Sequence, residues 1–157
     1  MKAASLKELK TELHTLHPSR VMDICLHLAK YKKENKELLT YLLFEAQDEQ
    51  FYINEVKELI DEQFKNVNKS NLYLAKKTLR KVLRTTSKYI KYSGIKQTEV
   101  ELLIYFCKKL RKSGIPLHEN TVTGNIYFRQ ILKIRKTLSS LHEDLQCDYA
   151  EEMKLVE

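Results

Sequence analysis

The stretch KKTLRKVLRTTSKYIKYSG, residues 76–94, decides how this chain folds. It holds five lysines and two arginines but no acidic residue. At about 100° per residue, the apolar residues between Leu72 and Ile90 gather on one side of a helix and the basic residues gather largely on the other. Gly94 follows, and glycine commonly ends a helix in the left-handed conformation. The stretch therefore predicts a long amphipathic helix, from about residue 70 to 92, with a buried apolar face and a solvent-facing basic one.

Helix signals continue on both sides of this stretch. Ser5 with Glu8, and Thr98 with Glu101, have the spacing of capping boxes that open helices. A last long helix is expected to carry apolar residues from Ile126 to Leu145, with an irregularity at Gly124. With only 3 Gly and 2 Pro, the chain has too few turn-forming residues for a β-sandwich or a doubly wound α/β fold. We expect an all-α fold of six or seven helices.

Two segments of the chain resemble each other. AKYKKENKELLTYL (29–42) and IKYSGIKQTEVELLIYF (90–106) share Lys-Tyr, a short polar loop and then Glu-Leu-Leu-x-Tyr. A duplicated three-helix unit explains this echo, and so does the ordinary similarity of leucine-rich helices; both interpretations stay open. Over residues 18–146 the pattern resembles HEAT and armadillo α–α repeats, although it carries no signature motif.

The resemblance implies an architecture and no functional residue. We expect a single domain over residues 1–157, built as a short right-handed α–α superhelix; a compact irregular helical bundle is the alternative. Within it, three-helix repeats would cover about 18–67 and 70–146, and an acidic C-terminal tail would cover about 142–157. The positions expected in the core share helical spacing on apolar faces: Val21, Ile24, Leu28, Leu39, Leu42, Leu43, Val56, Ile60, Phe64, Leu79, Val82, Leu83, Ile90, Leu102, Leu103, Phe106, Ile134, Leu138 and Leu141.

Positive charge is concentrated in one part of the sequence. Residues 1–62 hold 9 basic and 12 acidic residues, residues 63–98 hold 10 and none, and residues 99–157 hold 9 of each. The net charge of +7 therefore arises from the long helix and its flanks. Like charges spaced by four residues on a helix repel, so we expect something else to neutralise them.

Three sources of neutralising charge are open. The acidic tail, or the acidic segment 48–62, could pair with the basic face inside the molecule. Nucleic acid could bind it through phosphate contacts and stacking on tyrosine. An acidic protein or an anionic membrane surface could bind it instead. The residues expected to form the partner-binding face are Lys76, Lys77, Arg80, Lys81, Arg84, Lys88, Lys91 and Tyr73.

No motif in the sequence predicts catalysis, a metal site or a cofactor. His14 and His17 lie three residues apart near Cys25 and His27, yet no Cys-x-x-Cys or His-Glu-x-x-His pattern is present. Three scattered glycines exclude a glycine-rich phosphate loop. Cys25 and Cys107 occupy apolar positions and are expected in the core, while Cys147 lacks the electropositive setting of a reactive thiol.

The remaining features bear on location and function class. The N-terminal residues lack the apolar core of a signal peptide, no apolar run reaches the length of a membrane span, and the odd number of cysteines fits a reducing cytoplasm. We expect a cytoplasmic, non-enzymatic interaction module that presents its basic helix face to an acidic protein partner. A weakly sequence-specific nucleic-acid-binding module using the same face is the alternative.

Overall fold

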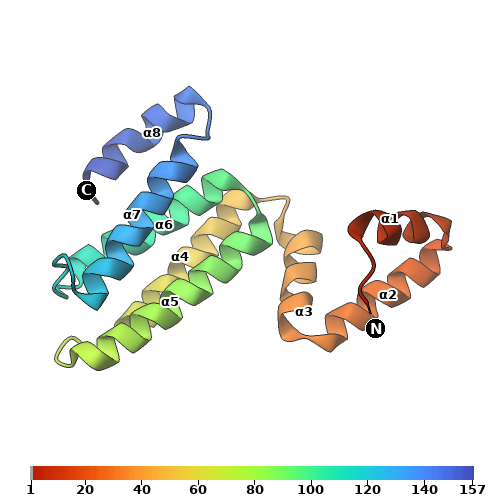
Figure 1. Ribbon diagram of the computed structural model, residues 1–157, viewed down its shortest axis with the longest axis horizontal. Helices are drawn as coiled ribbons and strands as arrows, with labels where there is room; N and C mark the ends of the chain where they lie inside the picture. Colours follow the sequence, from red (N-terminus) through yellow and green to blue (C-terminus); the bar gives the residue numbers. More distant parts are fainter. Residues whose placement is uncertain (1) are drawn as a thin grey trace. The chain divides into compact units, whose positions relative to one another are not determined.

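The computed structural model describes residues 2–157, and it confirms the all-α fold class: within these residues there are helices and no strand (Figure 1). Eight α-helices are present in this range, so the expected number of six or seven is not confirmed. Their bounds are α1 Leu6–Thr15, α2 Pro18–Tyr31, α3 Lys33–Thr40, α4 Glu49–Lys65, α5 Leu72–Ser93, α6 Lys96–Lys112, α7 Val122–Leu138 and α8 Glu143–Lys154, with a π-helical turn, η1, at Tyr41–Glu45.

The helices form two compact units, Met1–Phe44 and Glu45–Glu157. We call them the N-terminal unit and the C-terminal unit. The boundary lies inside the first of the two proposed repeats. Whether the units act as the single domain expected from the sequence stays a prediction, as does the internal repeat.

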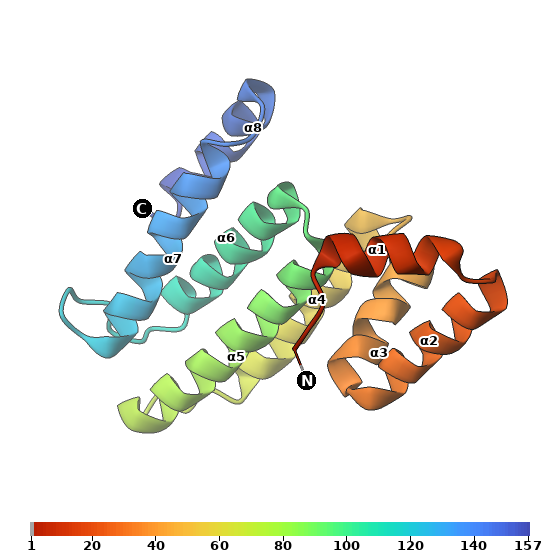
Figure 2. The same ribbon diagram turned by 45° about the vertical axis from the view of Figure 1, so that its right-hand side comes forward.

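The core of the C-terminal unit is centred on α6. This helix buries Val100, Leu103, Phe106 and four further apolar side chains, and it packs against α4, α5 and α7. Figures 1 and 2 show α4 and α5 side by side, with α8 lying along α7. From α5 the core receives Ala75, Leu79, Val82, Thr86 and Ile90, which is the apolar side that the helical spacing predicts. Burying one stripe of α5 fixes the rotation of the helix and turns its basic side outward.

The start of α6 corrects one sequence prediction. The helix begins at Lys96 without a side-chain cap, so Thr98 and Glu101 do not form a capping box. Instead Thr98 is buried, and its hydroxyl donates a hydrogen bond of 2.5 Å to the Glu49 carboxylate. The Ser93 hydroxyl donates to the same Glu49 oxygen at 2.5 Å. One carboxylate thus joins the first residue of α4 to the end of α5 and the start of α6.

The C-terminal region also differs from the expectation, because the last long helix is interrupted. α7 ends at Leu138, where the Ser139 and Ser140 hydroxyls donate to backbone carbonyls three residues earlier and compete with continued helix. His142 then caps α8, accepting a hydrogen bond from the Asp144 amide. The region expected as an acidic tail is therefore mostly helical, with Tyr149, Met153 and Val156 buried.

The N-terminal unit buries far less of its apolar surface than expected. None of the residues in α1, α2 or α3 is fully buried. The predicted core residues Leu28 and Leu42 are 53% and 56% exposed, Leu43 is equally exposed, and Cys25 is exposed. These predictions were wrong because helical spacing identifies an apolar face without saying what covers it. Three short helices are too small to enclose a core of their own.

Candidate functional site

Local sequence fixes both ends of α5, the helix that carries the basic face. Asn71 caps its first turn: the side-chain oxygen accepts hydrogen bonds from the Tyr73 and Leu74 amides at 3.0 and 3.1 Å. At the other end Gly94 adopts the left-handed conformation, with φ of 68°, and its amide donates to the Ile90 carbonyl. The predicted termination at Gly94 is confirmed.

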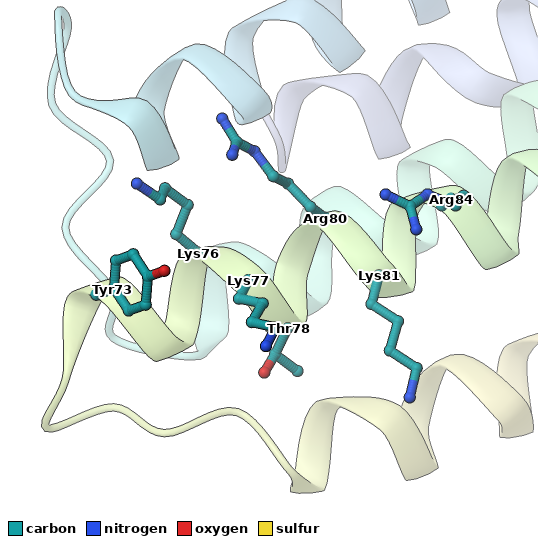
Figure 3. Close-up of a pocket in the computed structure, with 7 residues that line it drawn as sticks. All are labelled: Tyr73, Lys76, Lys77, Thr78, Arg80, Lys81 and Arg84. Carbon is teal, nitrogen blue, oxygen red and sulfur yellow. The ribbon is translucent and has the colours of Figure 1, made fainter.

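The structure places all eight residues predicted for the partner-binding face on α5. Tyr73, Lys77, Arg80, Lys81, Arg84 and Lys91 are exposed, and Lys76 and Lys88 are half-buried. A shallow hollow of about 660 Å³ follows the first three turns and is lined by Tyr73, Lys76, Lys77, Thr78, Arg80, Lys81 and Arg84. Figure 3 shows Lys76 and Arg80 leaning to one side of the helix and Lys77 and Lys81 to the other. Lys88 and Lys91 lie further along and do not line it.

Six cations of this face have no carboxylate within ion-pair distance. Among residues 2–157, no Asp or Glu oxygen lies within 4.0 Å of the side-chain nitrogens of Lys76, Lys77, Arg80, Lys81, Arg84 or Lys91. We call these residues the six unpaired cations. Several of them are four residues apart, about 6 Å along the helix axis, where like charges repel by a few tenths of a kcal/mol for each pair. Lys88 is not one of them, because it has partners, including the Tyr89 ring, whose centroid is 4.9 Å from its Nζ.

Several acidic residues of the C-terminal unit pair with cations outside α5. Of the tail residues, Glu152 pairs with Lys108 at 2.8 Å, and Glu157 pairs with Arg135 at 2.8 Å. Both views show α8 next to α7 and away from α5 (Figures 1 and 2). From α4, Asp61 pairs with Lys109 of α6 at 2.8 Å. These pairs involve cations of α6 and α7, and they leave the six unpaired cations of α5 without a carboxylate partner among the described residues.

Tyr73 gives the hollow an aromatic wall. Its side chain is 69% exposed at the first turn of α5, and Lys76 Nζ lies 5.3 Å from the centroid of its ring. A cation at this distance is attracted by the negative face of the ring. Thr78 also lines the hollow and was not among the predicted residues, although its position next to Lys77 and three residues before Lys81 was visible in the sequence.

Metal binding and thiol chemistry depend on how the His, Cys, Asp and Glu side chains of the described residues are arranged. No group of three or more His, Cys, Asp or Glu side chains in residues 2–157 is arranged to hold a metal ion. Cys107 is buried as expected, and burial raises the pKa of its thiol to about 12. None of the helices described is both long and apolar enough to cross a membrane.

Comparison of the chain with protein-family models, with curated proteins and with solved structures gives no significant match. The function must therefore be argued from the residues themselves.

Proposed function

We propose that this chain is a non-enzymatic interaction module that presents the basic face of α5 to an acidic protein partner. The observation that carries the proposal is that the six unpaired cations of α5 have no carboxylate partner among the described residues. Acidic side chains of the same unit pair instead with cations of α6 and α7. A helix that needed only solubility would gain from glutamates placed four residues from these lysines. Complementary charge on a partner would supply the missing neutralisation and speed up association.

We also propose that the chain is a single domain built as a right-handed α–α superhelix resembling HEAT repeats. We propose a cytoplasmic location for it. The support is the succession of amphipathic helices with few glycines and prolines, together with three free cysteines in the sequence.

Nucleic-acid binding by the same face is the second candidate, and the exposed ring of Tyr73 favours it. Bases stack on exposed aromatic rings, and loss of such a ring costs about 1–3 kcal/mol for each stacked base. Lysines and arginines beside the ring would contact phosphates, with a log–log salt slope of about −0.7 to −0.9 for each contact. An acidic protein would require neither effect.

The test is fluorescence anisotropy of the full chain with a labelled oligo-glutamate peptide and with labelled single- and double-stranded RNA and DNA, at low and moderate salt. The key variant is Lys77→Glu, Arg80→Glu, Arg84→Glu, which changes three exposed side chains. Its matched control is Lys2→Glu, Lys7→Glu, Lys136→Glu, which makes the same change in net charge at exposed positions outside α5.

We expect the peptide to bind in a salt-dependent way, the α5 variant to lose most of this binding, and the control variant to keep it. Tight nucleic-acid binding that falls on Tyr73→Ala would favour the second candidate. If the wild type binds none of these polyanions at low salt, or if both triple variants behave alike, the basic face is not the binding site.

A further inference from the structure

A second surface, in the N-terminal unit, combines an apolar floor with a basic rim. A groove of about 560 Å³ runs between α2, α3 and the π-helical turn η1. Its floor is aliphatic and aromatic, formed by Leu26, Leu39, Leu43 and Phe44. Three of these are largely open to solvent: Leu26 is 49%, Leu43 is 56% and Phe44 is 76% exposed. Large apolar side chains gathered in one concave surface mark an interaction site more often than single exposed ones do.

The rim of the groove is positively charged. The lining includes four lysines, Lys30, Lys32, Lys33 and Lys36, all exposed, and no acidic residue. One of them, Lys33, has an acidic partner, Glu37, whose carboxylate is 3.7 Å from Lys33 Nζ, and the Lys33 side chain is 85% exposed in that pair. Pairs this exposed contribute little, so the rim remains available to an external anion.

From this combination we infer that the groove binds an acidic amphipathic helix of a partner protein. A helix that lays its apolar face in a groove uses anchors at positions i, i+3 or i+4, and i+7, and such anchors match the apolar floor. Acidic residues flanking the anchors would then lie against the four lysines, which lets charge decide which amphipathic helices are accepted. This inference concerns residues other than those of α5 and does not depend on the function proposed for that helix.

Other occupants suit the groove less well. Nucleic acid bases would stack on aromatic rings, and Phe44 is the single aromatic side chain among the residues that line the groove, beside three leucines. In a two-fold symmetric dimer formed through this groove, a second copy of the chain would bring its own basic groove against this one and oppose lysine to lysine. An anionic membrane would meet the lysines but would not need a concave floor.

The test uses the full chain and a labelled synthetic helix with leucines at i, i+3, i+4 and i+7 and glutamates at its other exposed positions. Two matched peptides serve as controls: one replaces the glutamates by lysines, and the other replaces the leucines by glutamines. Two variants address the groove separately, Leu43→Glu on the floor and Lys32→Glu, Lys36→Glu on the rim. All three positions are exposed, and helicity and melting of each variant are checked by circular dichroism.

We expect the Leu/Glu peptide to bind at least tenfold more tightly than either control peptide, and each groove variant to weaken it at least tenfold. The α5 variant Lys77→Glu, Arg80→Glu, Arg84→Glu should change it less than twofold. If the α5 variant loses the peptide while the groove variants keep it, the inference is overturned and the proposal for α5 stands. Equal binding of the glutamine peptide and the Leu/Glu peptide would overturn the inference too. It would also be overturned if the chain does not bind the peptide but binds anionic vesicles or associates with itself, and if Leu43→Glu abolishes that vesicle binding or self-association.

Discussion

Gly124 shows how a single residue can be fixed by the close approach of two backbone segments. It lies in the first turn of α7, and a Cβ built there would be 2.0 Å from the carbonyl oxygen of His118. Because that neighbour is backbone, the loop before α7 would have to move. We expect Gly124→Ala to destabilise the protein by about 1–3 kcal/mol, as overpacking commonly does, and to lower Tm by several degrees.

The measurement for Gly124→Ala is thermal unfolding followed by circular dichroism. Asn125→Ala is the matched control, since it places alanine at an exposed position of the same helical turn and should leave Tm nearly unchanged. A Tm of Gly124→Ala equal to that of the control would mean that the loop near His118 yields without cost.

The buried thiol of Cys107 gives stability a dependence on alkaline pH. Burial raises its pKa from 9.0 to about 12, so between these values the unfolded chain loses the proton while the folded chain keeps it. The folded state then binds more protons, and the free energy of unfolding must fall as pH rises through this window. Well below pH 9 the thiol is protonated in both states and contributes no slope.

We expect urea unfolding between pH 8 and pH 11 to show a steeper loss of stability in the wild type than in Cys107→Ala. The comparison between the two proteins matters because lysines and tyrosines also titrate in this range. In native protein at pH 8, a thiol reagent should modify the exposed Cys25 and Cys147 rapidly and Cys107 only on unfolding. Parallel pH profiles for the two proteins, or three equally fast thiols, would contradict burial of Cys107.

At the scale of one helix, α5 carries a repulsion that a single substitution should relieve. Arg80 lies four residues from both Lys76 and Arg84, and none of the three has a carboxylate within 4.0 Å among the described residues. Arg80→Glu removes two repulsive pairs and adds two attractive ones, and each of these four contributions is about 0.2–0.5 kcal/mol. We therefore expect this variant to be more stable than the wild type by about 1–2 kcal/mol while it binds polyanions less well.

Urea unfolding at low salt measures this effect, and Arg80→Gln, which removes the charge without reversing it, should give roughly half of it. High salt should reduce both gains because exposed charges are screened. A loss of stability in Arg80→Glu at low salt would instead show that Arg80 has a stabilising partner, and it would remove the main support for the proposed binding face.

The same helix shows what a sequence can specify and where that information ends. The apolar spacing of Leu79, Val82 and Ile90 identified the buried side of α5, and the basic side followed from it as its complement. Equivalent spacing at Leu28 and Leu42 gave a wrong result, because an apolar face becomes core only when another element covers it. Thr98 shows a second limit: its spacing to Glu101 is typical of a capping box, but a tertiary hydrogen bond to Glu49 prevails. Propensity and local pattern yield to tertiary contacts of this kind.

For the candidate site, the sequence supplied the charged residues but not their state of pairing. Whether the acidic tail lay over α5 depended on how α8 packs, and Tyr149, Met153 and Val156 settle this by inserting into the core of the C-terminal unit. The groove of the N-terminal unit could not be foreseen in the same way, since two of its floor residues, Leu39 and Leu43, were expected in the core.

At the scale of the whole molecule, the two units should differ in how readily they open. α6 alone buries eight residues, whereas α1, α2 and α3 contain none that is fully buried. Local opening is easiest where few apolar groups are buried. We therefore expect amide hydrogens in residues 6–40 to exchange faster than those in α4–α7, by at least tenfold at neutral pH, when exchange of the full chain is followed by mass spectrometry. Uniform protection over both ranges would show instead that the units open together, as the single domain expected from the sequence would. A helix peptide bound in the groove should slow exchange in residues 18–44 and leave α5 unchanged, because binding stabilises only the unit that contacts the ligand.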